Sequence, residues 1–114
     1  MLVLADLASP TRRVYEQDYV GAAIFSIHDP DVQWADVAGI YIFAKSDQGQ
    51  WQPIYVGQAS SFKDRMANHE RWAEAQRLGA THVLALIVPQ QASRDGIERS
   101  LIQTFEPPLN QQLK

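Results

Sequence analysis

The sequence predicts a small α+β domain with a three-stranded, at least partly antiparallel sheet flanked by helices. Two short runs rich in β-branched and aromatic residues, 38–44 and 53–56, lie on either side of a polar turn. A continuous apolar run at 82–88 has the composition of a strand buried on both faces. Helical periodicity follows at 61–78 and 94–105. The resulting order, β–β–α–β–α, is typical of a sheet with helices packed on it.

Length and composition exclude several classes of protein. The 114 residues suffice for one compact domain, and 46% hydrophobic with 20% charged residues is ordinary for a soluble globular chain. The absence of cysteine excludes disulfides and thiolate metal sites. No apolar run approaches the roughly 18 residues of a membrane span, and the first residues lack the basic region of a signal peptide. We therefore expect a cytoplasmic protein that does not contact membranes.

The acidic residues are concentrated in the N-terminal third of the chain. The net charge of −3 argues mildly against a dedicated nucleic-acid binder. However, residues 1–36 carry six acids and two bases, whereas residues 37–114 carry a net charge of +1. We interpret 1–36 as an N-terminal extension, a short helix or irregular cover packed on the main domain of 37–114. Its charge and aromatic content suggest that it covers part of a functional cleft.

The first two predicted strands form a β-hairpin with a longish loop. Ser46, Asp47 and Gly49 supply turn chemistry, and the return strand begins at Pro53, where a proline is tolerated as the first residue. The helix that follows is capped by Ser60 or Ser61.

Each strand of this hairpin combines a tyrosine with a glycine: Gly39 with Tyr41, and Gly57 with Tyr55. Strand tyrosines are common and need no functional explanation. A glycine within or at the end of a strand loses packing, and it often marks close approach by another backbone or a ligand. The paired glycines therefore favour a functional site.

The helix predicted at 61–78 presents several polar residues along one edge of its buried stripe. Arg65, His69 and Trp72 follow at i, i+4 and i+7, so we expect them to project together. Its expected buried face consists of Phe62, Met66, His69, Ala73 and Gln76. Taken singly, Arg65 fits a rim arginine paired with a nearby acid, and His69 a satisfied, half-buried histidine. Together they offer a guanidinium fork for a phosphate beside an imidazole that can move a proton.

Glu98 is an unusual residue for its position in the second predicted helix. At 100° per residue it falls inside the apolar arc that contains Leu101 and Phe105. A carboxylate facing the core costs several kcal/mol unless it is paired. Two explanations stay open: a divalent cation bound by the carboxylate, or a capping box in which Glu98 returns to the amide of Asp95.

These residues together resemble the GIY-YIG nuclease family in type, separation and order. The motif positions are Gly39-Ile40-Tyr41, Tyr55-Val56-Gly57, Arg65, His69, Glu98 and Asn110. The resemblance covers about residues 37–112 and implies the sheet-and-helices core of a GIY-YIG endonuclease. It also implies hydrolysis of DNA phosphodiester bonds with one divalent ion, Mg²⁺ or Mn²⁺, held by Glu98.

The resemblance implies a role for each catalytic residue. Tyr41 would orient or deprotonate the attacking water, with Tyr55 and His69 assisting, and Arg65 would offset charge on the phosphate. The residues expected to contact or frame the DNA are Gly39, Gly57, Gln58, Lys63, Arg71 and Asn110. The chain departs from some family members, which carry a lysine where it has Gln58, so one positive charge near the phosphate is missing.

Two other functions stay open. The low positive charge favours a catalytically silent GIY-YIG module that binds nucleic acid or a protein partner, alone or within a larger assembly. A purely structural domain would require every polar motif position to coincide by chance.

Overall fold

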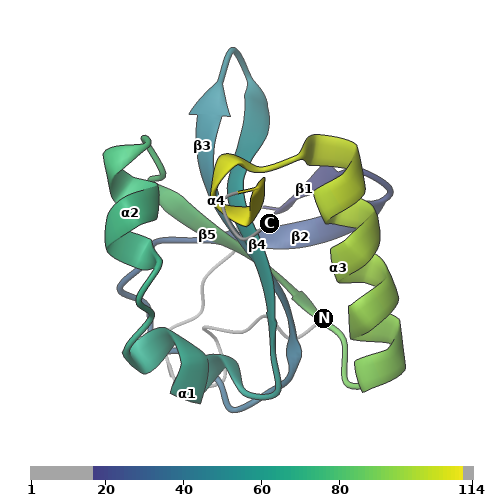
Figure 1. Ribbon diagram of the computed structural model, residues 1–114. Helices are drawn as coiled ribbons and strands as arrows, with labels where there is room; N and C mark the ends of the chain where they lie inside the picture. Colours follow the sequence, from purple (N-terminus) through teal and green to yellow (C-terminus); the bar gives the residue numbers. More distant parts are fainter. Residues whose placement is uncertain (1–16, 112–114) are drawn as a thin grey trace.

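The computed structural model describes residues 17–111 as a five-stranded antiparallel sheet flanked by helices (Figure 1). The strands are β1 (Gln17–Val20), β2 (Ala23–His28), β3 (Gly39–Asp47), β4 (Gln50–Ala59) and β5 (His82–Ile87). The helices are α1 (Phe62–Ala67), α2 (Trp72–Arg77), α3 (Gln91–Phe105) and α4 (Pro108–Gln111). The strand order is β1-β2-β5-β3-β4, so β4 lies at an edge.

The α+β class and the antiparallel pairing are confirmed, but the expectation of three strands is wrong. The segment interpreted as a short helix or irregular cover forms β1 and β2, and β2 pairs with β5. Exposed Tyr19 and Ile24, at 66% and 45%, add apolar residues to the outer surface of this hairpin. They hide the two-residue alternation that indicates a strand. The proposed cover falls partly on residues 1–16, which lie outside the described residues.

The hairpin of β3 and β4 has a shorter turn and longer strands than expected. Gln48 and Gly49 have φ of 53° and 80°, the positive pair that a type I′ two-residue turn requires. Pro53 lies within β4 rather than at its start. It is tolerated there because β4 is an edge strand and the register shifts beside Phe43 and Ala44.

The single helix expected at 61–78 is interrupted, giving α1 and α2. Ser61 is the N-cap of α1, and its Oγ accepts a hydrogen bond from the Asp64 backbone N–H at 3.3 Å, as the sequence predicted. The interruption at 68–71 resets the helical phase. Consequently α2 buries Ala75, and it leaves Ala73 and Gln76, which were expected on the buried face, exposed.

Alternation along β3 divides the core between the two faces of the sheet. Tyr41 and Phe43 pack in one cluster with residues of α1 and α2, whereas Ile40 and Ile42 pack in another with Leu101 of α3. Within the described part of the chain, no helix is long and apolar enough to cross a bilayer.

The second predicted helix is confirmed but starts earlier than expected. α3 begins after its N-cap Gln90 and ends before Glu106, whose φ of 45° is left-handed. Asp95 is therefore an interior residue of α3, and the capping box proposed for Glu98 is wrong. A short helix that the sequence did not indicate, α4, begins at Pro108, the second residue of the proline pair.

Candidate functional site

Polar residues form two groups, one on each side of the edge strand β4. In Figure 1, β4 passes between α1 and α2 on one side and α3 on the other. The first group, here named the phenol cluster, consists of Tyr41, Tyr55, Arg65 and His69. The second, here named the carboxylate cluster, consists of Gln58, Arg94, Asp95 and Glu98.

Tyr41 is the buried centre of the phenol cluster. Its side chain is only 1% exposed, and its hydroxyl lies 2.6 Å from Nε2 of His69. Tyr41 is paired across the hairpin with Gly57, and a Cβ at Gly57 would collide with the tyrosine ring and hydroxyl. Burial, reinforced by the neighbouring Tyr55, raises the pKa of Tyr41, and the positive charge of Arg65 opposes this. The phenol is therefore protonated at neutral pH.

The hydrogen bonds of His69 define its tautomer. Its Nδ1 accepts the Arg71 backbone N–H at 3.1 Å, so Nδ1 carries no proton. A neutral imidazole with this acceptor bears its proton on Nε2, which donates to the Tyr41 oxygen. Burial and the charge of Arg65 lower the pKa of His69 to about 4. At neutral pH the imidazole thus donates a hydrogen bond to the Tyr41 oxygen and is not placed to remove the phenol's proton.

Tyr55 is the phenol of this cluster with access to solvent. It is half-buried, and its ring centroid lies 6.2 Å from that of Tyr41 and 5.7 Å from that of His69. Phe43 and Trp72 back the cluster, with their centroids 4.9 Å apart. The rings fix the orientation of the polar groups by packing.

Arg65 forms a bidentate ion pair with an acid that the sequence analysis did not single out. Its two terminal nitrogens donate to Glu70 at 2.7 and 3.2 Å. The hydrogen bond from Arg65 lowers the pKa of Glu70 to about 2, and the same contact raises the pKa of Arg65. The reading of Arg65 as a rim arginine paired with an acid therefore holds. The two residues are five positions apart in the sequence, and the helix interruption at 68–71 brings them together.

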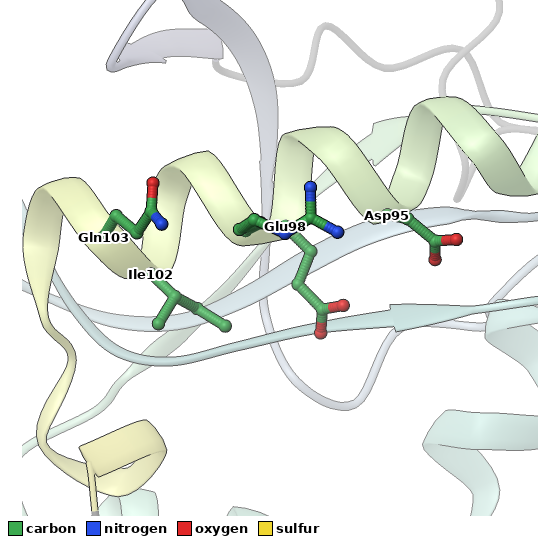
Figure 2. A pocket seen from close by; sticks show the side chains of 5 residues that line it. Asp95, Glu98, Ile102 and Gln103 are labelled. Carbon is green, nitrogen blue, oxygen red and sulfur yellow. The ribbon is translucent and has the colours of Figure 1, made fainter.

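The carboxylate cluster is organised around the side chain of Gln58. Its Nε2 donates to Asp95 and to Glu98, each at 2.8 Å, and its Oε1 accepts from Nε of Arg94 at 3.2 Å. Asp95 and Glu98 line an open cavity of about 310 Å³, and Figure 2 shows both carboxylates directed to the same side of α3. The contacts of Arg94 and Asp95 with Gln58 could not be predicted from the sequence, because they depend on the placement of β4 beside α3.

The carboxylate cluster fits a hard divalent cation that keeps most of its water. Asp95 and Glu98 offer oxygen donors at the cavity wall. Across residues 17–111, no group of three or more His, Cys, Asp or Glu could enclose a metal ion. Mg²⁺ is commonly bound by one or two carboxylates together with waters and substrate phosphates. Glu98, the sequence-predicted ligand, is thus in a suitable place.

Asn110 braces the edge of β4. Its side-chain oxygen accepts the Val56 N–H and its amide donates to the Val56 carbonyl, both at 2.9 Å. A buried amide in α4 thus occupies the hydrogen-bonding positions of a further strand. Gly39 has no room for a side chain either, since a Cβ there would collide with Phe62 and the Leu86 carbonyl.

The remaining residues predicted to bind DNA are at the surface. Lys63 is exposed on α1, and Arg71 pairs with Glu74 at 2.9 Å. Their DNA contacts, and those of Gly39 and Gly57, stay predictions.

Comparison with known proteins identifies the fold. No family model and no curated protein matches the sequence. The chain is similar to the solved GIY-YIG N-terminal endonuclease domain of UvrC from Thermotoga maritima bound to magnesium, its catalytic divalent cation. Identity is 24%, the match covers 65% of this chain and 83% of that one, and the TM-score is 0.51. The chain therefore has the GIY-YIG nuclease fold, as the sequence motifs indicated.

Two variants of the same domain, each bound to its catalytic divalent cation, match equally well. In one a tyrosine is replaced by phenylalanine, and in the other an asparagine by alanine. Both are 24% identical to this chain, cover 65% of it over 82% of their own length, and have a TM-score of 0.51.

Proposed function

We propose that this protein is a metal-dependent endonuclease that hydrolyses DNA phosphodiester bonds. The observation that carries the proposal is the placement of the phenol cluster and the carboxylate cluster on either side of edge strand β4, within a GIY-YIG nuclease fold. A guanidinium, phenols and an acid that can bind a cation are groups that can serve phosphodiester hydrolysis.

Residues of the phenol cluster act on the phosphate and the attacking water. Arg65 releases Glu70 and binds a phosphate oxygen with its two-pronged guanidinium, which offsets charge that develops in the transition state. Tyr55 has solvent access and meets the water, whereas the motif assigns that task to Tyr41. Tyr41, only 1% exposed, holds the imidazole of His69 against the site. Separate Tyr41→Phe and Tyr55→Phe variants decide which phenol contacts the water.

Glu98 is the proposed ligand of one divalent ion, Mg²⁺ or Mn²⁺. The ion, when bound, stabilises negative charge on the phosphate and on the leaving oxygen. The solved domain that this chain resembles binds magnesium as its catalytic cation, which supports a divalent ion here.

The second candidate is a catalytically silent module that binds nucleic acid or a protein partner. One observation favours it: both charged groups central to catalysis have partners within the chain. Arg65 is paired with Glu70, and Glu98 accepts a hydrogen bond from Gln58. In a silent module these contacts persist when the ligand binds.

Plasmid nicking with Mg²⁺ or Mn²⁺ distinguishes the two functions. Glu98→Gln removes the charge of the proposed ligand while keeping its shape, and Glu106→Gln, at the exposed C-cap of the same helix, is the matched control. The enzyme is supported if the wild type and Glu106→Gln cut and Glu98→Gln does not. If all three are inert but retard DNA in a gel, the silent module is the correct function.

A further inference from the structure

The orientation of the Gln58 side chain is fixed by what surrounds it. Carboxylates can only accept hydrogen bonds and a guanidinium can only donate them. The amide nitrogen must therefore face Asp95 and Glu98, and the amide oxygen must face Arg94. In a flipped amide the oxygen would face the two carboxylates and the N–H groups would face the guanidinium, and neither contact is a hydrogen bond. The network therefore admits one arrangement.

Arg94 anchors this amide to the backbone. It is only 6% exposed, and NH1 donates to the carbonyls of Val88 and Pro89 at 3.1 and 2.8 Å. These carbonyls lie just before α3, so the guanidinium is fixed at the base of the helix. A continuous chain of hydrogen bonds thus runs from this turn through Arg94 and Gln58 to Glu98.

Gln58 also determines how the two carboxylates face each other. Asp95 and Glu98 both lie 2.8 Å from one nitrogen atom, although like charges at such short range repel. A neutral amide offers each of them one N–H. The amide therefore keeps the two carboxylates together and leaves their negative charge available to attract a cation. A lysine at this position would cancel part of that charge.

We propose that Gln58 is a positioning residue of the divalent-ion site, which holds the Glu98 carboxylate in the orientation that binds the ion. The inference rests on the proposed function, because it assumes that Glu98 is the ligand. Groups that orient a metal-binding residue commonly change metal affinity about 10–100-fold when they are lost.

Mn²⁺ affinity, measured on the full chain by the paramagnetic resonance of free Mn²⁺, tests the inference without relying on catalysis. Gln58→Met keeps the length of the side chain but removes both hydrogen-bonding ends, and we expect it to weaken binding about 10-fold or more. Gln52→Met, at an exposed position of the same strand, is the matched control and should bind like the wild type. Thermal unfolding of the metal-free proteins checks that the variants fold.

A shorter amide provides the second variant, since Gln58→Met leaves two carboxylates adjacent and can prevent folding. Gln58→Asn keeps the polarity but cannot span from Arg94 to Glu98, and we expect it also to bind Mn²⁺ more weakly than the wild type. In any active variant, the Mn²⁺ concentration for half-maximal cutting should rise while cutting at saturating Mn²⁺ recovers. Loss of maximal cutting alone, with no change in Mn²⁺ affinity, would overturn the positioning role.

The outcomes for the two proposals differ. If the wild type binds Mn²⁺ and Glu98→Gln does not, but the folded Gln58 variants bind like the wild type, the inference fails and the proposed function stands. If Glu98→Gln binds as tightly as the wild type, Glu98 is not the ligand, and both proposals fail.

Discussion

Two histidines, the buried His28 and the half-buried His69, should make the fold less stable in weak acid. Burial lowers the pKa of His28, and likewise that of His69, from 6.5 to about 4. His28 is 2% exposed, and its Nε2 lies 2.8 Å from Ser26 Oγ. The Ser26 hydroxyl donates to the Ala85 carbonyl, so the serine oxygen is the acceptor of the His28 Nε2–H. Both rings are thus held neutral at pH 7.

The sign and size of the effect follow from linkage. Between pH 6.5 and pH 4 the unfolded chain binds protons at these histidines that the folded chain does not, so stability is complete above pH 6.5 and is lost as the pH falls towards 4. With folded pKa values of about 4 and unfolded values of 6.5, each histidine costs about 2 kcal/mol at pH 5. The pKa of Glu70 is lowered to about 2, so the stability that its ionised carboxylate contributes is lost only as the pH falls below 4.5.

Urea unfolding followed by tryptophan fluorescence at pH 7.5, 6 and 5 measures this dependence. The free energy of unfolding of the wild type should fall by about 4 kcal/mol across this range. His28→Gln and His69→Gln should each reduce that fall to about half, even if they lower stability at pH 7.5. The reasoning is refuted if either variant shows the pH dependence of the wild type, or if NMR titration of His28 or His69 in the wild type gives an ordinary pKa.

Four further substitutions test other contacts. Gly57→Ala should destabilise the fold by about 1–3 kcal/mol, because the added methyl group meets a buried phenol, whereas Gly96→Ala, with open space around it in α3, should stabilise it by about 0.5–1 kcal/mol; thermal unfolding compares them. Asn110→Ala leaves a backbone N–H and carbonyl of β4 unpaired and should cost about 2–4 kcal/mol in urea unfolding; a loss below 1 kcal/mol would contradict the bracing role. Glu70→Gln frees Arg65 and should raise DNA affinity severalfold in fluorescence anisotropy, whereas unchanged affinity would mean that the arginine does not meet the phosphate.

Much of the fold could be predicted because its signals are local. Ser61 caps α1 and Glu106 ends α3 before two prolines, as the sequence indicates, since capping and proline sterics act within one helical turn. The helix at 61–78 was predicted as continuous because periodicity does not reveal that His69 Nδ1 captures the Arg71 N–H. That side-chain contact competes with helical hydrogen bonding.

The sequence by itself determined most of the candidate site residues, because the GIY-YIG positions follow one another in the family's order along the chain. Only the tertiary structure decided their states. The burial of Tyr41, the pairing of Arg65 with Glu70 and the link from Gln58 to Glu98 each depend on which strand lies at the sheet edge and which helix packs beside it. Desolvation and hydrogen bonding act over a few ångströms, so they are set by contacts between residues that are distant in sequence.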